Sequence, residues 1–131
     1  MNKAIQETIQ QCAEDSYSGR RNFGAIVGSL IEAGVESYYA DYRSATTTYY
    51  MPDGSTHTAT LHAPKLDIPQ IFDAKSLQAA IKGAQRNEVK YPEFLERSFS
   101  AGCAGYIVWI AGRHVSYFGR RGEVHIEKFP D

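Results

Sequence analysis

Two stretches with the same layout decide how this chain folds: residues 49–61, YYMPDGSTHTATL, and residues 117–129, YFGRRGEVHIEKF. Each has two aromatic residues, then a glycine, then a histidine, at the same spacing. In the first stretch, Pro52, Asp53 and Gly54 suit a three-residue hairpin turn with a bulge, in which the glycine takes the left-handed conformation. The layout therefore predicts two copies of an antiparallel strand pair.

The predicted turn also fixes which side chains lie opposite each other. It places two tyrosine–histidine pairs across from each other on neighbouring strands: Tyr49 with His57, and Tyr117 with His125. Successive side chains of a strand point to opposite faces of the sheet. Since Val124 and Ile126 are aliphatic, we expect their face to cover the core and the tyrosine–histidine pairs to point away from it.

The flanking sequence extends the repeat. Apolar residues recur at helical spacing in four segments: 4–13, 23–31, 74–87 and 91–102. Six segments have a composition that favours strands: 36–42, 46–50, 55–61, 104–111, 114–118 and 123–129. A shift of 68 residues aligns residues 33–57 with residues 101–125 without a gap, with six identities in 25 positions. The order of elements is therefore two helices and three strands, twice.

We predict an α+β fold, built from a duplicated helix–helix–three-strand unit whose mostly antiparallel sheet packs against the helices. A chain of 131 residues lies within the usual size of one domain, about 100 to 150 residues. The expected single domain spans 1–131, with pseudo-repeats at about 1–61 and 74–129. The connector 62–73 is expected to pack across the core. One sheet of all the strands and two facing sheets both fit this pattern.

Composition and charge argue against several classes of function. The chain has 43% hydrophobic and 22% charged residues, as in ordinary globular proteins. Its net charge of −1 offers no general attraction to nucleic acid or to an anionic membrane, so we expect neither partner. The N-terminal segment lacks the apolar region of a signal peptide. Cys12 and Cys103 are expected to be buried, reduced thiols, and the protein is expected to be cytoplasmic.

No motif in the sequence carries a specific chemistry. The histidines show neither HxH nor HExxH spacing, so we predict no metal site. The sequence has no phosphate-binding glycine loop, and we predict no cofactor and assign no catalytic residue.

The tyrosine–histidine pairs are the feature that packing explains least. One interpretation is structural, because cross-strand pairs of this kind stabilise a sheet. The other is that duplication places two equivalent pairs about a pseudo-twofold axis, where they line a groove. On that interpretation the protein is a non-enzymatic module that binds a small molecule or a protein partner on its sheet face. The predicted ligand-binding residues are Tyr49, His57, Tyr117 and His125.

Two other functions stay open. A histidine of the same face would serve as the general base of a small hydrolase or isomerase. Segment 113–121 mixes basic and aromatic residues, as single-stranded nucleic-acid binders do. Glu123 and Glu127 dilute its positive charge, so nucleic acid is the less favoured partner.

The strand predicted at 105–111, GYIVWIA, is apolar on both of its faces. A strand of this kind needs cover on both sides of the sheet. If the helices cover one face, a second subunit is expected to cover the other, and we predict a homodimer.

The run AGV.SYYADYRSATTTYY..DG at 33–54 and the run YPEFLERSFSAGCAGYIVWIAGRHVSYFGRRGEVHIEKFP at 91–130 carry a family resemblance. They resemble the YbcV-like small proteins of enterobacteria and their prophages, a family of unknown function that is sometimes labelled "phage envelope protein". The resemblance covers nearly the whole chain, and its most specific part is YFGRRGEVHIEKFP at 117–130. It implies a bacterial, prophage-related protein and supplies no catalytic residues.

Overall fold

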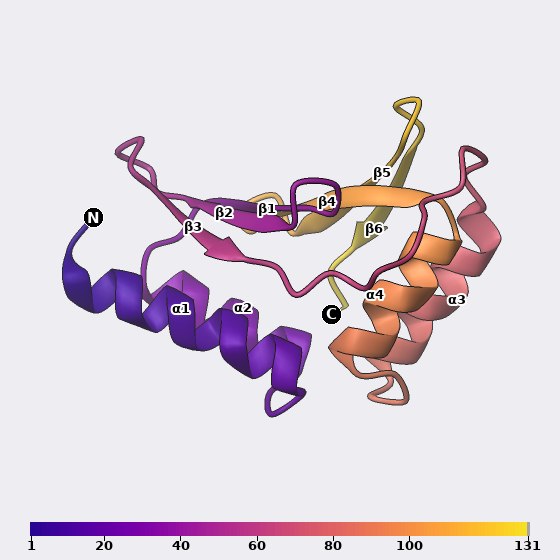
Figure 1. Cartoon of the computed structure of the whole chain (residues 1–131). Helices are drawn as coiled ribbons and strands as arrows, with labels where there is room; N and C mark the ends of the chain where they lie inside the picture. The colour runs from indigo at the N-terminus through magenta and orange to yellow at the C-terminus, as the bar shows by residue number, and fades with distance from the viewer. Residues whose placement is uncertain (131) are drawn as a thin grey trace.

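The computed structural model describes residues 1–130 and shows the predicted duplication (Figure 1). Two helices and three strands follow one another, and the same order is then repeated. The α+β class and the helix–helix–three-strand repeat are therefore confirmed. The elements are α1 (Lys3–Ser18), α2 (Phe23–Glu32), β1 (Ser37–Asp41), β2 (Thr46–Tyr50), β3 (Thr56–Thr60), α3 (Ala74–Gln85), α4 (Tyr91–Ser100), β4 (Cys103–Trp109), β5 (His114–Gly119) and β6 (Val124–Lys128).

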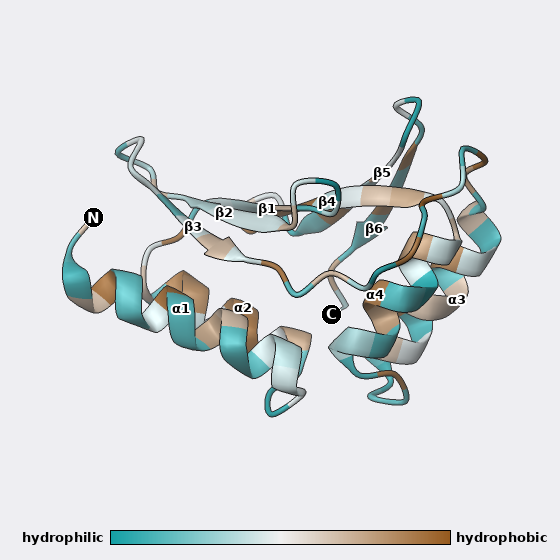
Figure 2. Cartoon of the chain, in the orientation of Figure 1, coloured by the Kyte–Doolittle hydropathy of each residue, from teal (hydrophilic) through white to brown (hydrophobic). Residues whose placement is uncertain are grey.

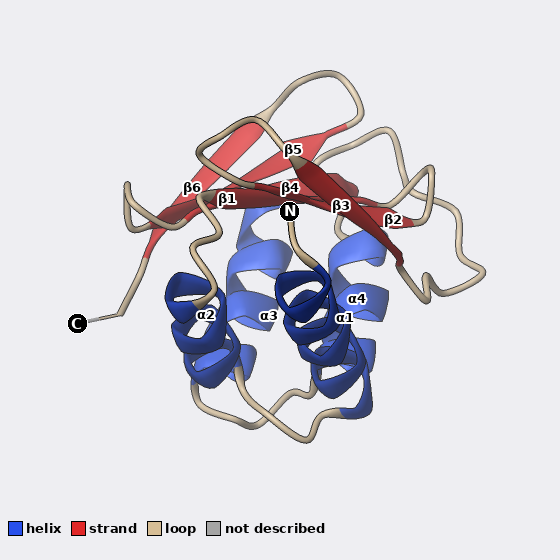
Figure 3. Cartoon of the chain, turned by 90° about the vertical axis from the view of Figure 1, so that its left-hand side faces the viewer, coloured by secondary structure: helices blue, strands red, loops and turns tan. Residues whose placement is uncertain are grey.

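All six strands form one sheet in the order β3-β2-β1-β4-β5-β6, and every neighbouring pair is antiparallel. The two repeats therefore meet in the middle of the sheet, where β1 pairs with β4. All four helices lie on the same face, as hairpins α1–α2 and α3–α4, and the opposite face carries no helix (Figure 3). Figure 2 shows hydrophilic and hydrophobic residues on each helix, as expected where one side packs on a sheet.

Short polar residues start three of the helices. Asn2 accepts a hydrogen bond from the N–H of Ile5 at 2.8 Å, and Asn22 caps α2 in the same way at 2.9 Å. Asp73 caps α3 by accepting a hydrogen bond from the N–H of Ser76 at 3.1 Å. The first turn of α4 contains Pro92, and no side chain caps this helix. Local hydrogen bonds fix the starts of α1, α2 and α3, and proline fixes the backbone at the start of α4. Helix starts that depend on such local features can be predicted from the sequence.

The hairpin register is confirmed, but the predicted direction of its faces is wrong. Tyr49 lies opposite His57, and Tyr117 lies opposite His125. Both tyrosines point to the helix side, where they are 4% and 7% exposed. Val124 and Ile126, the residues that were expected to face the core, are 51% and 59% exposed on the open face.

The central strands explain this reversal. Tyr38 of β1 lies beside Tyr49, and Tyr106 of β4 lies beside Tyr117, so the four tyrosines share one face. The helices cover the middle of the sheet, and residues of the central strands therefore decide which face is buried. Val124 and Ile126 belong to the edge strand β6, where an aliphatic side chain does not indicate which face of the sheet is buried.

The connector 62–73 runs from β3 to α3 and is tied to the second repeat (Figure 1). The N–H of Asp73 donates to the carbonyl of Ala101 at 2.7 Å, and Arg120 donates to the carbonyl of Ile68 at 3.0 Å. Gly102 has a φ of +87° and lies directly against the backbone of Ile71. Within residues 1–130, the equivalent Gly34 of the first repeat has no backbone atom within 4 Å of its Cβ position, so the repeats are not equivalent in their packing.

Both cysteines are free and buried, as expected. Burial raises the pKa of the Cys103 thiol to about 11, so this residue packs as a small hydrophobic side chain. None of the helices in residues 1–130 combines the length and the hydrophobicity needed to cross a lipid bilayer.

Candidate ligand-binding cavity

A cavity of about 410 Å³ lies between the helix side of the sheet and the two helical hairpins. Its lining includes residues from all four helices or their ends and from strands of both repeats. Small-molecule sites usually have volumes of about 300 to 1,000 Å³. The cavity is therefore large enough to enclose a small organic ligand.

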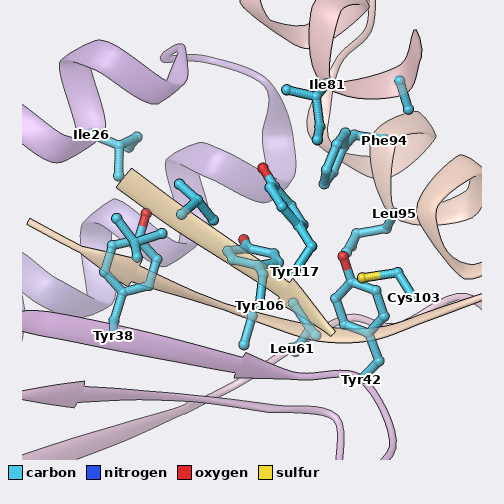
Figure 4. Packing of buried hydrophobic residues seen from close by; sticks show 14 of the residues in the cluster. Ile26, Tyr38, Tyr42, Leu61, Ile81, Phe94, Leu95, Cys103, Tyr106 and Tyr117 are labelled. Atoms are coloured by element: carbon cyan, nitrogen blue, oxygen red, sulfur yellow. The ribbon is translucent and has the colours of Figure 1, made fainter. Parts of the chain in front are cut away.

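Four tyrosines from the central part of the sheet form the roof of the cavity. The rings of Tyr38 and Tyr49 stack with their centroids 5.2 Å apart, and those of Tyr106 and Tyr117 lie 5.5 Å apart. The two pairs occupy equivalent positions in the two repeats. Figure 4 shows Tyr38, Tyr106 and Tyr117 reaching from the sheet toward the helices. Duplication thus builds one roof from two copies of the same pair.

Three of the roof hydroxyls have no hydrogen-bond partner among residues 1–130. The hydroxyls of Tyr106 and Tyr91 are 2.7 Å apart and pair with each other. Those of Tyr38, Tyr49 and Tyr117 have no such contact, yet no side-chain oxygen or nitrogen in the described residues is both shielded and unpaired. These three hydroxyls therefore reach the open space of the cavity, although each residue is more than nine-tenths buried.

The buried phenols keep their protons near neutral pH. Burial raises the pKa of Tyr91 to about 12, and it raises the pKa values of Tyr38, Tyr49 and Tyr117 well above the usual value for tyrosine. A phenol of this kind donates a hydrogen bond but does not act as a base. The roof therefore offers donors to any molecule in the cavity.

The helix-side wall is apolar. It is formed mainly by Ile26 of α2, Ile81 of α3 and Phe94 of α4, all of which are at most 6% exposed (Figure 4). Aromatic pairs lie at the exposed rim: Tyr17 against His62, and Phe23 edge-on against Phe129. Such walls favour a ligand with an apolar or aromatic body.

The floor consists of the α1–α2 loop and the α3–α4 loop, where α2 and α4 begin. The ammonium group of Lys90 lies 3.4 Å from the carbonyl oxygen of Gly19 and so joins the two loops. Arg21 donates to Asp15 at 2.9 Å and to Ser29 at 2.7 Å. Hydrogen bonds from Gln11 and from the neighbouring arginines hold the pKa of Asp15 below its usual value. This ion-pair network fixes the first loop on α1.

The structure brings together only half of the predicted ligand-binding residues. Tyr49 and Tyr117 line the cavity, whereas neither His57 nor His125 is part of its lining. The Nε2 atom of His57 lies 3.4 Å from Gln10 Oε1, and that of His125 lies 3.2 Å from Glu127 Oε1. Both histidines belong to the edge strands, so they lie outside the tyrosine roof.

Sequence reasoning missed Tyr38, Tyr106, Tyr91 and Lys90 as cavity residues. A signal existed for the first two, since Tyr38 and Tyr106 are identical positions of the repeat. Tyr106 belongs to the strand 105–111, whose two apolar faces suggest core packing and not a cavity lining. Tyr91 and Lys90 stand at the start of a helix, and no local pattern places them beside the sheet.

The basic and aromatic residues of segment 113–121 do not gather on one surface. Tyr117 faces the helices and its neighbour Phe118 the opposite side. Arg113 lies over the ring of Phe129, and Arg121 pairs with Glu123 at 3.4 Å. Among residues 1–130, no group of three or more His, Cys, Asp or Glu side chains is arranged to hold a metal ion.

Comparison with known proteins links the chain to sequences without an assigned function. Residues 11–128 match the family described as "Protein of unknown function (DUF1398)". The chain is also similar to "Uncharacterized protein Rv2012" of Mycobacterium tuberculosis (strain ATCC 25618 / H37Rv) and "Uncharacterized protein Mb2035" of Mycobacterium bovis. Each is 27% identical over 134 residues, covering 92% of this chain and 76% of the relative.

Proposed function

We propose that this chain, which belongs to the DUF1398 family of proteins of unknown function, is a non-enzymatic binding protein for a small organic molecule. The ligand occupies the cavity between the sheet and the two helical hairpins. The observation that carries the proposal is the set of three phenol hydroxyls that have no partner within residues 1–130 and reach into a cavity with an apolar helix-side wall. A concave, largely apolar site with a few polar groups that point into it is the usual form of a small-molecule site.

The proposal treats residues 1–131 as one domain. Each repeat supplies one tyrosine pair of the roof and one helical hairpin of the wall. Half of the chain would leave the cavity open on one side, so binding requires both repeats together. The connector supports this arrangement because it ties the end of β3 to the second repeat.

One observation favours the alternative of a hydrolase or isomerase. Glu127 lines the cavity, and its Oε1 atom lies 3.2 Å from the Nε2 atom of His125. A carboxylate contact of this kind can orient a general base. Binding is the better supported function, because His125 itself lies outside the cavity lining and the phenols stay protonated. A His125→Gln variant is expected to retain ligand affinity if the protein only binds.

The first test uses the uncharged fluorophore N-phenyl-1-naphthylamine, whose emission rises in apolar surroundings. We expect saturable binding at one site per chain. Replacing Ala84, which lines the cavity on α3, by phenylalanine is expected to fill the space and weaken binding at least about tenfold. The matched control is Ala79→Phe, which places the same side chain on an exposed position of α3 outside the cavity.

Circular dichroism spectra of the two variants establish that both are folded. Equal affinity of Ala84→Phe and Ala79→Phe for the fluorophore would show that the dye binds elsewhere, and the cavity would lose its role as the site.

We further propose that the protein is a homodimer through the open face of the sheet. Trp109, Val124 and Ile126 are at least 40% exposed there, and Ile107 and Phe118 of the same face are partly exposed. Ile126→Lys is expected to shift the protein toward the monomer in sedimentation velocity experiments. Thr56→Lys, on the other edge of the same face, serves as the control. A sedimentation profile that is the same for both variants and wild type would contradict this interface.

Within its family, we propose that the chain belongs with the YbcV-like proteins of enterobacteria and their prophages. Segment 117–130 supports this grouping, because it is the most specific part of the resemblance. The composition and the two reduced, buried cysteines support a cytoplasmic location.

A further inference from the structure

We infer that the cavity selects organic anions, that is, molecules with an apolar body and one carboxylate or similar group bound at the floor where α2 and α4 begin. The inference rests on the proposed function, since it names the class of ligand for the same cavity. It follows from the balance of hydrogen-bond donors and acceptors, from the two helix N-termini, and from the charges of the lining.

The roof of the cavity offers hydroxyl donors that have no partner within residues 1–130. The unpaired hydroxyls of Tyr38, Tyr49 and Tyr117 belong to residues that are at least 93% buried and line the cavity. As protonated phenols they need acceptors. Among residues 1–130, the one carboxylate that lines the cavity is that of Glu127, which already lies beside His125. A ligand that satisfies the roof must therefore bring its own acceptors.

Two helix N-termini meet at the floor. Asn22 caps α2 through the N–H of Ala25, which leaves the N–H groups of Phe23 and Gly24 without a side-chain acceptor. No side chain caps α4, whose first residue is Tyr91. Phe23, Gly24 and Tyr91 all line the cavity. N-terminal N–H groups and the helix dipole both favour an anion at such a place.

The charges of the lining act in the same direction. The basic residues among the lining are Arg21, Lys90 and Lys128, against the single acid Glu127. Arg21 is neutralised by Asp15, and the side chain of Lys128 shares the open face with Ile126. Lys90 forms no ion pair within residues 1–130. The whole chain has a net charge of −1, so this local positive charge is a property of the cavity. Lys90 lies at the floor, between the two loops.

These features discriminate between classes of ligand. A cationic ligand would meet the unpaired ammonium group of Lys90, and the one carboxylate of the lining, that of Glu127, already lies beside His125. A purely apolar ligand would leave the roof hydroxyls and the helix N-termini without acceptors. The carboxylate of an organic anion supplies an acceptor to the helix N-termini and a charge opposite to that of Lys90 at the floor.

The test compares three ligands with the same naphthalene body in competition with N-phenyl-1-naphthylamine, supported by calorimetry. They are 1-naphthaleneacetate, its neutral isostere 1-naphthaleneacetamide, and the cation 2-(1-naphthyl)ethylammonium. We expect the acetate to bind at least about tenfold more tightly than the acetamide, with the ammonium weakest.

The variant Lys90→Met keeps the length of the side chain but removes the charge. It is expected to reduce the preference for acetate over acetamide to about threefold or less. Lys82→Met, on an exposed position of α3 outside the cavity, is expected to keep the full preference.

The possible results separate the inference from the proposed function. Equal binding of the three ligands, with the fluorophore still displaced, would overturn the anion preference and leave the cavity as a binding site. Full preference in Lys90→Met would overturn the placement of the anion at the floor. If neither the fluorophore nor any naphthalene ligand bound, the proposed function would fail, and the inference with it.

Discussion

Replacing Gly102 by alanine is expected to remove a large part of the stability of this protein. The residue has a φ of +87°, and a Cβ atom placed there would clash with the carbonyl oxygen of Ile71. The left-handed conformation alone costs an L-residue about 1 to 2 kcal/mol. The contact adds to this because the obstacle is backbone, which cannot rotate away. We expect a total loss of at least about 4 kcal/mol, out of the roughly 5 to 15 kcal/mol of a typical domain.

Gly34 provides the control, because it holds the equivalent position in the first repeat. It has the same φ of +87°, but the nearest atom to its Cβ position is the flexible Cε of Met51 at 3.5 Å. Gly34→Ala is therefore expected to cost about 1 to 2 kcal/mol, the conformational term alone. Urea unfolding measures both losses. Equal losses would show that the connector does not constrain Gly102 in solution.

The second large effect is expected at Leu95. This residue of α4 is 0% exposed and packs in the core beneath the sheet. Leu95→Ala removes buried methyl groups and leaves a space that the rigid surroundings fill only in part. Substitutions of this kind cost about 2 to 5 kcal/mol, and we expect a loss of about 3 kcal/mol in the free energy of unfolding.

Leu66 of the connector allows the same substitution at a position that is 47% exposed. Leu66→Ala is expected to change stability by less than about 1 kcal/mol. Both variants are measured by urea unfolding under the same conditions. A loss in Leu95→Ala no larger than that in Leu66→Ala would mean that α4 does not form part of the rigid core.

Local features of the fold could be predicted from the sequence because short-range interactions control them. The strand 46–50 and the start of α3 after Asp73 agree with the structure. The turn at Gly54 and the left-handed Gly34 also agree. Each depends on capping, turn geometry or side-chain alternation, which involve residues only a few positions apart.

Of the four site residues predicted from the sequence, only two line the cavity. The repeat singled out Tyr49 and Tyr117, which do line the cavity, and equally singled out His57 and His125, which do not. The repeat could identify equivalent positions but not their distance from the sheet centre. That distance depends on the strand order, which places β3 and β6 at the edges.

The sequence by itself determined the elements, their duplication and the pairing within each hairpin, because periodicity and turn residues act locally. Only the tertiary structure decided which face of the sheet is buried, since this depends on the helices and on the central strands β1 and β4. It also decided that Tyr38 and Tyr117 share a roof above the floor at Lys90. These residues are distant in the chain and meet only because two repeats pack as one unit around a common cavity.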